Sequence, residues 1–469
     1  MKWTILSALL FLLASCKKYL DVPLPINEIA SQSAFSNDAA AGASLNAIYA
    51  GLFTSDVFGG TSGVGYATGM YGDELTNYNS LNTSFQAVYQ DEVSSTLGGV
   101  TATWSTLYTQ MYAINQAIAY IPQSSSLVYQ NQWLGEAYFL RGLCYFYLTN
   151  LYGDVPLVLT TDYLANNSLA RTPQAGVYTQ IISDLKMAQS LLSDAYHNGS
   201  GSATADRGRP NRMAATALLS RTYLYTSQWA NAESEADSLL GDATDYQLAA
   251  PAGVFLINSK EIIWGLVPLG SPYPAYAVQD APVYYLAPGT IPPATGVAVA
   301  LSDSLVKAFE PNDTRFTNWV SVDSTTGGVL YFAYKYKAFK NLTAPVESTV
   351  MLRLGEQYLI RAEARAEQNN LSGAAADLNA VRARAGLGVT TAVTQAALLS
   401  AILKERRIEL FLENGNRFLD LRRTGNLDAV MGSVATAKGG SWSSYKEWWP
   451  IPATDIQNDK QLTQTPGFQ

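Results

Sequence analysis

The strongest constraint on the fold is an alanine-rich pair of helices that occurs twice in the chain. Residues 214–225 have helical composition, residues 226–229 form a turn, and residues 230–240 supply a second helix. The same layout returns within residues 358–384 around a turn at 369–371. Alanine lets two helices approach closely, so each segment predicts a helical hairpin. A chain with such hairpins is expected to be mainly α-helical.

Further helices follow from apolar residues spaced three and four apart. Stripes at 133–151 and 177–195 predict another pair, and the hairpins together resemble tetratricopeptide-like units. We place helical repeats at about 101–240 and 350–425. The ligand-side segments at about 55–100 and 245–350 are expected to be irregular, with short strands at 254–258, 261–267 and 330–336. The predicted fold class is therefore mainly α, with helix pairs beside an irregular half of short strands and long loops.

The N-terminus has the pattern of a bacterial export signal. Met1-Lys2 is a basic start, residues 4–14 are apolar but too short to span a bilayer, and Leu13-Ala14-Ser15-Cys16 resembles a lipobox. We expect residues 1–15 to be a signal peptide, Cys16 to be lipidated, residues 16–24 to form a leash, and residues 25–469 to form one domain. An ordinary signal peptide with a chance cysteine is the alternative. No later stretch is apolar and long enough to cross a membrane.

Composition excludes several classes of function. The formal net charge of −8 disfavours a nucleic-acid binder that works through basic patches. His197 is the only histidine, which excludes a multi-histidine metal site, and it lies at the edge of a loop. Cys144 lies on an apolar helical stripe, where a buried small side chain is expected. We therefore predict no cofactor and no metal.

Catalysis finds little support in the sequence. Asp73-Glu74 and Asp91-Glu92 are adjacent carboxylates, and a glycosidase needs two carboxyls across a cleft. Glu405, Glu409 and Glu413 share one helix face, and several arginines are close in sequence. A structural arginine–glutamate network is the interpretation we favour, and no catalytic motif is present.

Binding is better supported, because aromatic residues make up 11% of the chain. Tyrosine stacks on the apolar face of a sugar, and Asn or Asp hydrogen-bonds its hydroxyls. Two segments are rich in these residues: 57–82, with six glycines, and 268–288, with five prolines and no Lys or Arg. The alternative is that these tyrosines pack the loops onto the helices. The lack of positive charge in the second segment favours a neutral ligand. The candidate ligand-binding residues are Tyr71, Asp73, Asn77, Tyr78, Tyr273, Tyr276, Asp280, Tyr284 and Tyr285.

Several segments, in order along the chain, resemble the SusD/RagB family of surface nutrient-binding lipoproteins of Bacteroidetes-type bacteria. The most specific is Glu405-Arg-Arg-Ile-Glu-Leu410 followed by Arg417-Phe-Leu-Asp-Leu-Arg-Arg-Thr-Gly425. Asn414-Gly-Asn-Arg417 and Gln464-Thr-Pro-Gly-Phe468 depart from the family's usual sequence motifs at these positions. The other segments that carry the resemblance are 16–21, 151–157, 212–229, 358–364, 378–386, 449–452 and 462–468.

The resemblance implies a SusD-like domain built on four tetratricopeptide-like helix pairs, with an irregular ligand-binding half and no catalysis. It implies a location on the outer membrane, facing the exterior, and a SusC-like TonB-dependent transporter as partner. It implies a glycan as ligand, although some members handle peptides. The family's ligand residues do not carry over to this sequence. Two alternatives stay open: a structural lid for a transporter of a non-glycan nutrient such as peptide, and a surface glycosidase.

Overall fold

The computed structural model describes residues 33–54, 57–271, 275–287, 289–294, 296–325 and 328–468. The predicted signal peptide, the leash, Cys16 and Tyr273 lie outside the described residues.

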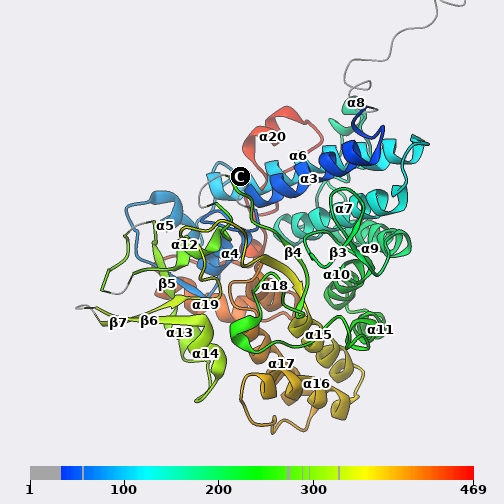
Figure 1. Cartoon of the computed structure of the whole chain (residues 1–469). Helices are drawn as coiled ribbons and strands as arrows, with labels where there is room; N and C mark the ends of the chain where they lie inside the picture. Colours follow the sequence, from blue (N-terminus) through cyan, green and yellow to red (C-terminus); the bar gives the residue numbers. More distant parts are fainter. Residues whose placement is uncertain are drawn as a thin grey trace, which may run out of the picture.

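Helix pairs form one side of the molecule, and they confirm the predicted mainly α fold (Figure 1). The helices form four pairs, α3–α6, α7–α9, α10–α11 and α15–α16, within the described residues. Each pair also packs against the next one in this order. The first pair was missed in part, because the sequence analysis began the repeats at residue 101. The helices are α3 (Asp38–Thr54), α6 (Gly98–Tyr120), α7 (Gln130–Tyr152), α9 (Gln174–Leu191), α10 (Arg212–Tyr225), α11 (Trp229–Leu240), α15 (Leu354–Glu367) and α16 (Leu371–Arg384).

Small residues explain how closely the paired helices approach. A Cβ on Gly142 in α7 would lie 2.9 Å from a Leu185 methyl carbon in α9, closer than two such carbons pack. In the α10–α11 pair, the Ser220 hydroxyl donates to the Ala232 carbonyl at 3.0 Å. The two predicted hairpins also turn alike, since Ser227 and Asn369 both have positive φ, +55° and +62°. Both residues lie in the turns between the paired helices, where Asn and Ser tolerate the left-handed conformation.

The irregular half leaves the helical array and returns to it through two paired strands. β4 (Ile262–Leu266) follows α11 and runs antiparallel to β8 (Thr349–Arg353), which precedes α15. Both strands are buried along their whole length. The paired strands β4 and β8 form the base of the irregular half. They let α11 and α15 pack as neighbours, although the irregular half separates these helices in the sequence. The scattered spacing of the hairpins in the sequence therefore reflects an insertion that loops out from β4 and β8.

The rest of the chain consists of short elements around this base. β1 (Leu75–Asn77) pairs with β5 (Val299–Leu301), β2 (Tyr196–His197) with β3 (Ala203–Thr204), and β6 (Val320–Thr325) with β7 (Gly328–Ala333), all antiparallel. The remaining α-helices are α4 (Val64–Tyr71), α5 (Thr83–Tyr89), α8 (Tyr163–Asn166), α12 (Asp280–Tyr284), α13 (Asp303–Val306), α14 (Thr314–Trp319), α17 (Gln395–Glu409), α18 (Asn416–Arg423), α19 (Leu427–Ala437) and α20 (Ala453–Asn458). Short 3₁₀ helices cover Ile121–Gln123, Pro251–Gly253 and Ser444–Glu447.

Three local predictions need correction. The strand at 254–258 is wrong, because a turn follows the 3₁₀ helix Pro251–Gly253 and only Leu256 makes an isolated bridge. The strand at 330–336 ends at Ala333, so residues 334–336 are irregular. The segment 57–82 contains helix α4 and strand β1, because its small residues pack against the body: a Cβ on Gly65 would meet the Leu412 carbonyl oxygen at 2.5 Å.

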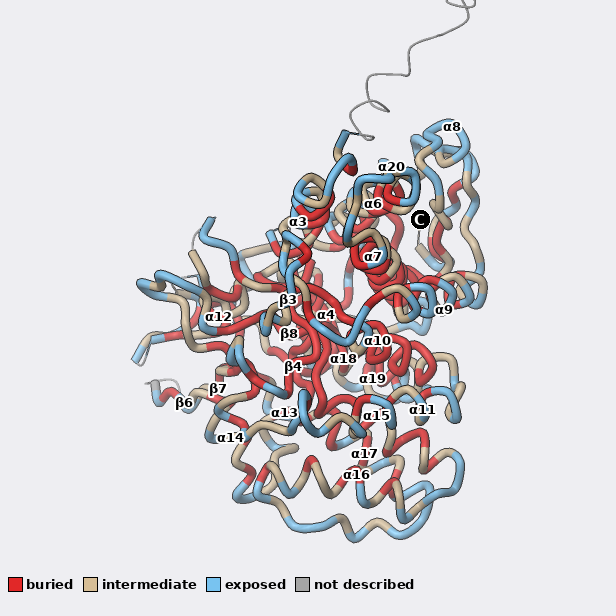
Figure 2. The backbone as a smooth tube through the Cα atoms, turned by 45° about the vertical axis from the view of Figure 1, so that its right-hand side comes forward, coloured by how far each residue is buried: buried red, intermediate tan, exposed pale blue. Residues whose placement is uncertain are grey.

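The predicted arginine–glutamate network is confirmed, but with different partners. Glu409 on α17 pairs with Arg315 at 2.8 Å, with Arg353 at 2.5 Å, and with Arg384. Glu413 pairs with Arg353 and with Lys335. These cations come from α14, β8, α16 and the segment after β7, and not from the neighbouring Arg406 or Arg407. Figure 2 shows the region where β4, β8, α4 and α18 meet as a continuous buried core.

Candidate functional site

The two segments chosen from the sequence lie against each other. The Gly60 amide donates to the Asp280 carboxylate at 2.9 Å, and the rings of Tyr66 and Tyr284 are 5.7 Å apart. A Cβ on Gly59 would lie 3.1 Å from Gln279, so this glycine allows the close approach. Segments that are distant in the chain thus pack against each other, largely through buried residues.

Three of the predicted ligand residues are instead part of the core. Tyr71 is fully buried against Phe418, Trp442 and Trp449, and its hydroxyl donates to the Lys446 carbonyl. Asp73 is buried and accepts two hydrogen bonds from Arg417, whose charge helps hold its pKa below the usual range against the effect of burial. These side chains have no surface left to offer a ligand, so the prediction is corrected for both.

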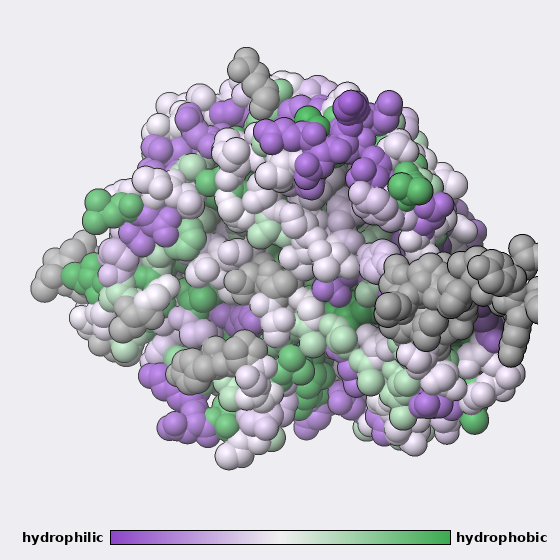
Figure 3. All heavy atoms as spheres, turned by 90° about the horizontal axis from the view of Figure 1, so that it is seen from above, coloured by the Kyte–Doolittle hydropathy of each residue, from purple (hydrophilic) through white to green (hydrophobic). Residues whose placement is uncertain are grey.

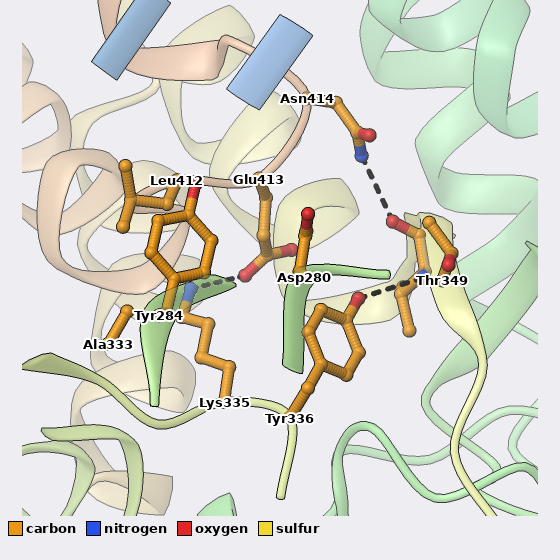
Figure 4. Close-up of a pocket in the computed structure, with 10 residues that line it drawn as sticks. Asp280, Tyr284, Ala333, Lys335, Tyr336, Thr349, Leu412, Glu413 and Asn414 are labelled. Atoms are coloured by element: carbon orange, nitrogen blue, oxygen red, sulfur yellow. Dashed lines mark hydrogen bonds and ion pairs between the residues drawn. The ribbon is translucent and has the colours of Figure 1, made fainter. Parts of the chain in front are cut away.

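Tyr284 is the third buried residue, and it lines a small enclosed cavity (Figure 4). Lys335 reaches Glu413 across this cavity at 2.5 Å, and Asp280 lies between Tyr284 and Tyr336. The hydroxyls of Tyr284 and Thr349 are buried with no hydrogen-bond partner among the described residues. The cavity measures about 20 Å³, which is room for one water molecule and far too little for a sugar. Tyr284 therefore supports the loop from below and does not face a ligand.

An aromatic cluster remains at the surface beside this cavity. We define it as Tyr285, Tyr334 and Phe339, all partly exposed. The Tyr285 ring lies 5.8 Å from that of Tyr334 and 5.5 Å from that of Phe339. Tyr285 was predicted from the sequence, but Tyr334 and Phe339 were not, because they lie outside the two segments chosen by composition and Tyr334 falls in a predicted strand.

Backbone contacts fix the aromatic cluster in place. The Tyr334 amide donates to the Trp319 carbonyl at 2.7 Å. After Tyr285, the Gly289 amide donates to the Asp323 carboxylate on β6. The rings therefore come from two segments that are each tied to the β6–β7 hairpin or to the helix before it, which gives the cluster a preformed geometry.

The other predicted residues make separate local contacts. Tyr78 is 37% exposed at the end of β1, and its amide donates to the Ala298 carbonyl. Asn77 donates from its side chain to Gln86 at 2.9 Å. Tyr276 is partly exposed, has a positive φ of +59°, and places its hydroxyl over Gly270. Tyr78 and Tyr276 keep solvent-facing surface, so they stay candidates.

Two open grooves elsewhere were not foreseen. One, of about 560 Å³, lies between α3, the β2–β3 hairpin and the segment after β4, and its lining includes Tyr49, His197 and Arg209. Arg209 is committed there to Glu136 and Asn46. The other, of about 480 Å³, lies between α10, α15 and α17 and includes Trp229 and Glu367. Both are of a size that holds small ligands, but the lining of each offers one partly exposed Tyr, Trp or Phe, Tyr49 in the first and Trp229 in the second, against three such rings in the aromatic cluster.

Within the described residues, no helix combines the length and apolarity needed to cross a bilayer. On the face seen in Figure 3, hydrophobic residues occur in small separate groups among hydrophilic ones. The described part of the chain also holds no group of three or more His, Cys, Asp or Glu that could bind a metal. Cys144 is buried as predicted, and burial raises the pKa of its thiol to about 12.

Known proteins share this architecture over almost the whole chain. A family profile described as "Starch-binding associating with outer membrane" matches residues 18–224, and the profile of the SusD family matches residues 310–468. SusD-like protein P2 of Formosa agariphila is 24% identical over 98% of each chain. A solved SusD superfamily protein from Bacteroides vulgatus has a TM-score of 0.77 at 22% identity, with 92% of this chain and 100% of that chain covered. A solved laminarin-binding SusD-like protein gives 0.77 at 25% identity, with the same coverage.

An array of helix pairs that carries a preformed aromatic loop surface defines a class of α-rich binding proteins. Within that class, the two profiles match most of the chain from residue 18 to residue 468. The chain belongs to the SusD/RagB family. This family is associated with the outer membrane, and its members are known as binding proteins.

Proposed function

We propose that this protein binds a glycan at the cell surface and delivers it, without catalysis, to a SusC-like TonB-dependent transporter in the outer membrane. Lipidation at Cys16 would hold it there. Family membership supports this general role, and the names of relatives that bind starch or laminarin support a glycan as the ligand class. Neither family membership nor the names of these relatives identify the specific glycan.

The observation that carries the proposal is the aromatic cluster. Three partly exposed rings from two segments lie within stacking distance of one another on a backbone that is already fixed. Sugar rings stack on such surfaces, and a preformed surface loses little entropy on binding. The small cavity behind Tyr284 is too small for a sugar, which supports the aromatic cluster over this cavity as the proposed site.

The test is a glycan screen of the full chain, purified in detergent, by affinity electrophoresis and calorimetry. We expect a saturable hit with a dissociation constant between micromolar and millimolar, on the order of −4 to −8 kcal/mol. The double variant Tyr285→Ala/Tyr334→Ala should weaken it about tenfold or more, since each stacking contact contributes about 0.5–1.5 kcal/mol. Tyr445→Ala is the matched control, because Tyr445 is 38% exposed and packs on Phe468 in the same way elsewhere.

Three outcomes would contradict the proposal. No glycan hit from a folded protein would favour the transport of a non-glycan nutrient such as peptide. New reducing ends after incubation would make the protein a glycosidase. Unchanged affinity in a folded double variant would show that the aromatic cluster is not the binding site. The groove beside Tyr49 would then be the next candidate.

A further inference from the structure

Two lysines lie beside the aromatic cluster, although the segment that carries Tyr285 has no Lys or Arg. Lys337 places its ammonium 5.1 Å from the centre of the Tyr334 ring, and Lys340 lies 5.2 Å from the centre of the Phe339 ring. Both lysines come from the irregular segment after β7. The expectation of a neutral ligand rested on residues 268–288 alone, and the fold brings these cations to Tyr285 from a later segment of the chain.

Neither ammonium is neutralised by a partner among the described residues. Across that part of the chain, neither nitrogen forms an ion pair with a carboxylate, whereas Lys335, which lies shortly before Lys337, is paired with Glu413. Glu347 is the acidic residue that acts on Lys337, but it is buried, and its carboxylate already accepts hydrogen bonds from the backbone amides of Lys337 and Ala338 at 2.9–3.0 Å. Glu347 thus fixes the backbone of this segment and leaves both ammonium groups available.

Local charge decides which ligand such a surface accepts. The chain as a whole carries a formal net charge of −8, which repels anions at long range. At physiological ionic strength, however, charges beyond about 8 Å are largely screened, so the two lysines beside the rings dominate at the surface. Rings that receive the C–H face of a sugar, together with two free ammonium groups, match a sugar that carries a carboxylate or a sulfate.

We propose that the surface formed by the aromatic cluster with Lys337 and Lys340 selects anionic glycans over neutral ones. This inference rests on the proposed function and names the substrate class of the same site. Binding to it should fall as salt rises, in contrast to stacking on a neutral sugar.

The experiment compares glycans that differ only in charge. One pair is an oligogalacturonate and its carboxyl-reduced counterpart, and the other is dextran sulfate and dextran. Calorimetry of the full chain at about 20 and about 200 mM NaCl, on either side of physiological ionic strength, should show binding to at least one anionic member, weaker at high salt. The neutral member should bind at least tenfold more weakly. The first pair tests a carboxylate and the second a sulfate ester.

Variants assign the effect to the two lysines. Lys337→Gln/Lys340→Gln should weaken anionic binding about 5- to 20-fold and remove most of its salt dependence, because each exposed charge pair contributes a few-fold. Lys337→Arg/Lys340→Arg should retain it. Lys186→Gln is the matched control, since Lys186 is exposed and likewise lies over a ring, Tyr223, on the helical side.

The outcomes separate the two proposals. If neutral members bind as well as anionic ones, or if the double glutamine variant binds like the wild type, the selection for anions is wrong while glycan binding stands. If neither member of either pair binds, and the broader screen finds no glycan, both proposals fail together.

Discussion

Glu74 shows how a single buried carboxyl makes stability depend on pH. It is buried next to Asp73, and the two nearby arginines are hydrogen-bonded or ion-paired to Asp73, whereas Glu74 accepts one hydrogen bond from the Leu412 amide. Burial, reinforced by the charge of Asp73, raises the pKa of Glu74 to about 7 from 4.5. The folded state therefore holds a proton that the unfolded chain releases.

We expect stability to fall as pH rises through this window. The contribution of Glu74 is fully present below pH 4.5, is lost progressively up to about pH 7, and amounts to about 3 kcal/mol. Glu74→Gln imitates the protonated form, so its denaturant midpoint should fall less than that of the wild type between about pH 5 and about pH 8. Asp91, whose pKa is also raised to about 7 by burial, keeps its share in both proteins. Parallel pH profiles would contradict this assignment.

The residues of the candidate site were predictable only in part. Composition located the two loops that meet at Gly60 and Asp280, because Tyr, Asn and Gly mark such segments whatever their partners are. It did not distinguish Tyr71 from Tyr285, since the burial of Tyr71 depends on Trp442 and Trp449, which lie near the other end of the chain. Lys337 and Lys340 were missed because the charge of the site was inferred from residues 268–288 alone, and the fold brings the lysines to Tyr285 from a later segment.

At the scale of elements, helix α17 connects the two halves of the molecule through its acidic face. Glu409 contacts arginines from α14, β8 and α16, and their positive charges hold its pKa well below the usual range despite burial. The motif that contains Glu405 and Glu409 therefore stabilises the fold, because it joins α17 to other elements through buried ion pairs. Its acidic spacing was visible in the sequence, but its partners were not, because they come from three separate elements, of which α14 and β8 are distant from α17 in the chain.

Removing this charge should be costly. Glu409→Gln leaves Arg315, Arg353 and Arg384 buried with a missing counter-charge, so we expect a loss of about 3–5 kcal/mol in the free energy of unfolding. Lys307→Ala breaks an exposed pair with Asp303 and should change it by at most about 1 kcal/mol. Denaturant unfolding followed by tryptophan fluorescence compares the two. Equal, small losses would show that the network does not hold α17 to the core.

The elements themselves were predicted unevenly. Helix pairs with internal periodicity, such as α10–α11 and α15–α16, follow from local sequence. The short strands do not, because their existence depends on distant pairing: the segment 254–258 has the composition of a strand but lacks a partner ladder, whereas β4 finds β8 on the far side of the insertion. The composition of either segment alone does not predict such non-local contacts.

On the scale of the whole molecule, the insertion between β4 and β8 carries the aromatic cluster, and the helix pairs on either side of it pack against one another. Buried ion pairs from Arg315 and Lys335 of the insertion to Glu409 and Glu413 join it to this array. Surface loops on such a framework can vary without loss of the core. The proposed glycan-binding surface and the predicted lipid attachment at Cys16 therefore belong to different parts of the chain and can be tested separately.

The predicted lipidation at Cys16 can be tested by substituting this residue, without changing the proposed binding surface. Cys16→Ser removes the thiol that accepts the diacylglycerol, and stable anchoring requires more than one acyl chain. We expect the variant to lose labelling by radioactive palmitate and to leave the membrane fraction, while the purified variant binds glycan with unchanged affinity. Growth on the bound glycan should fail, because a protein released from the membrane no longer stays beside the transporter. Tyr285→Ala/Tyr334→Ala should behave in the opposite way, with full labelling and with glycan binding weakened about tenfold or more. Persistent palmitate labelling of Cys16→Ser would contradict the lipobox interpretation.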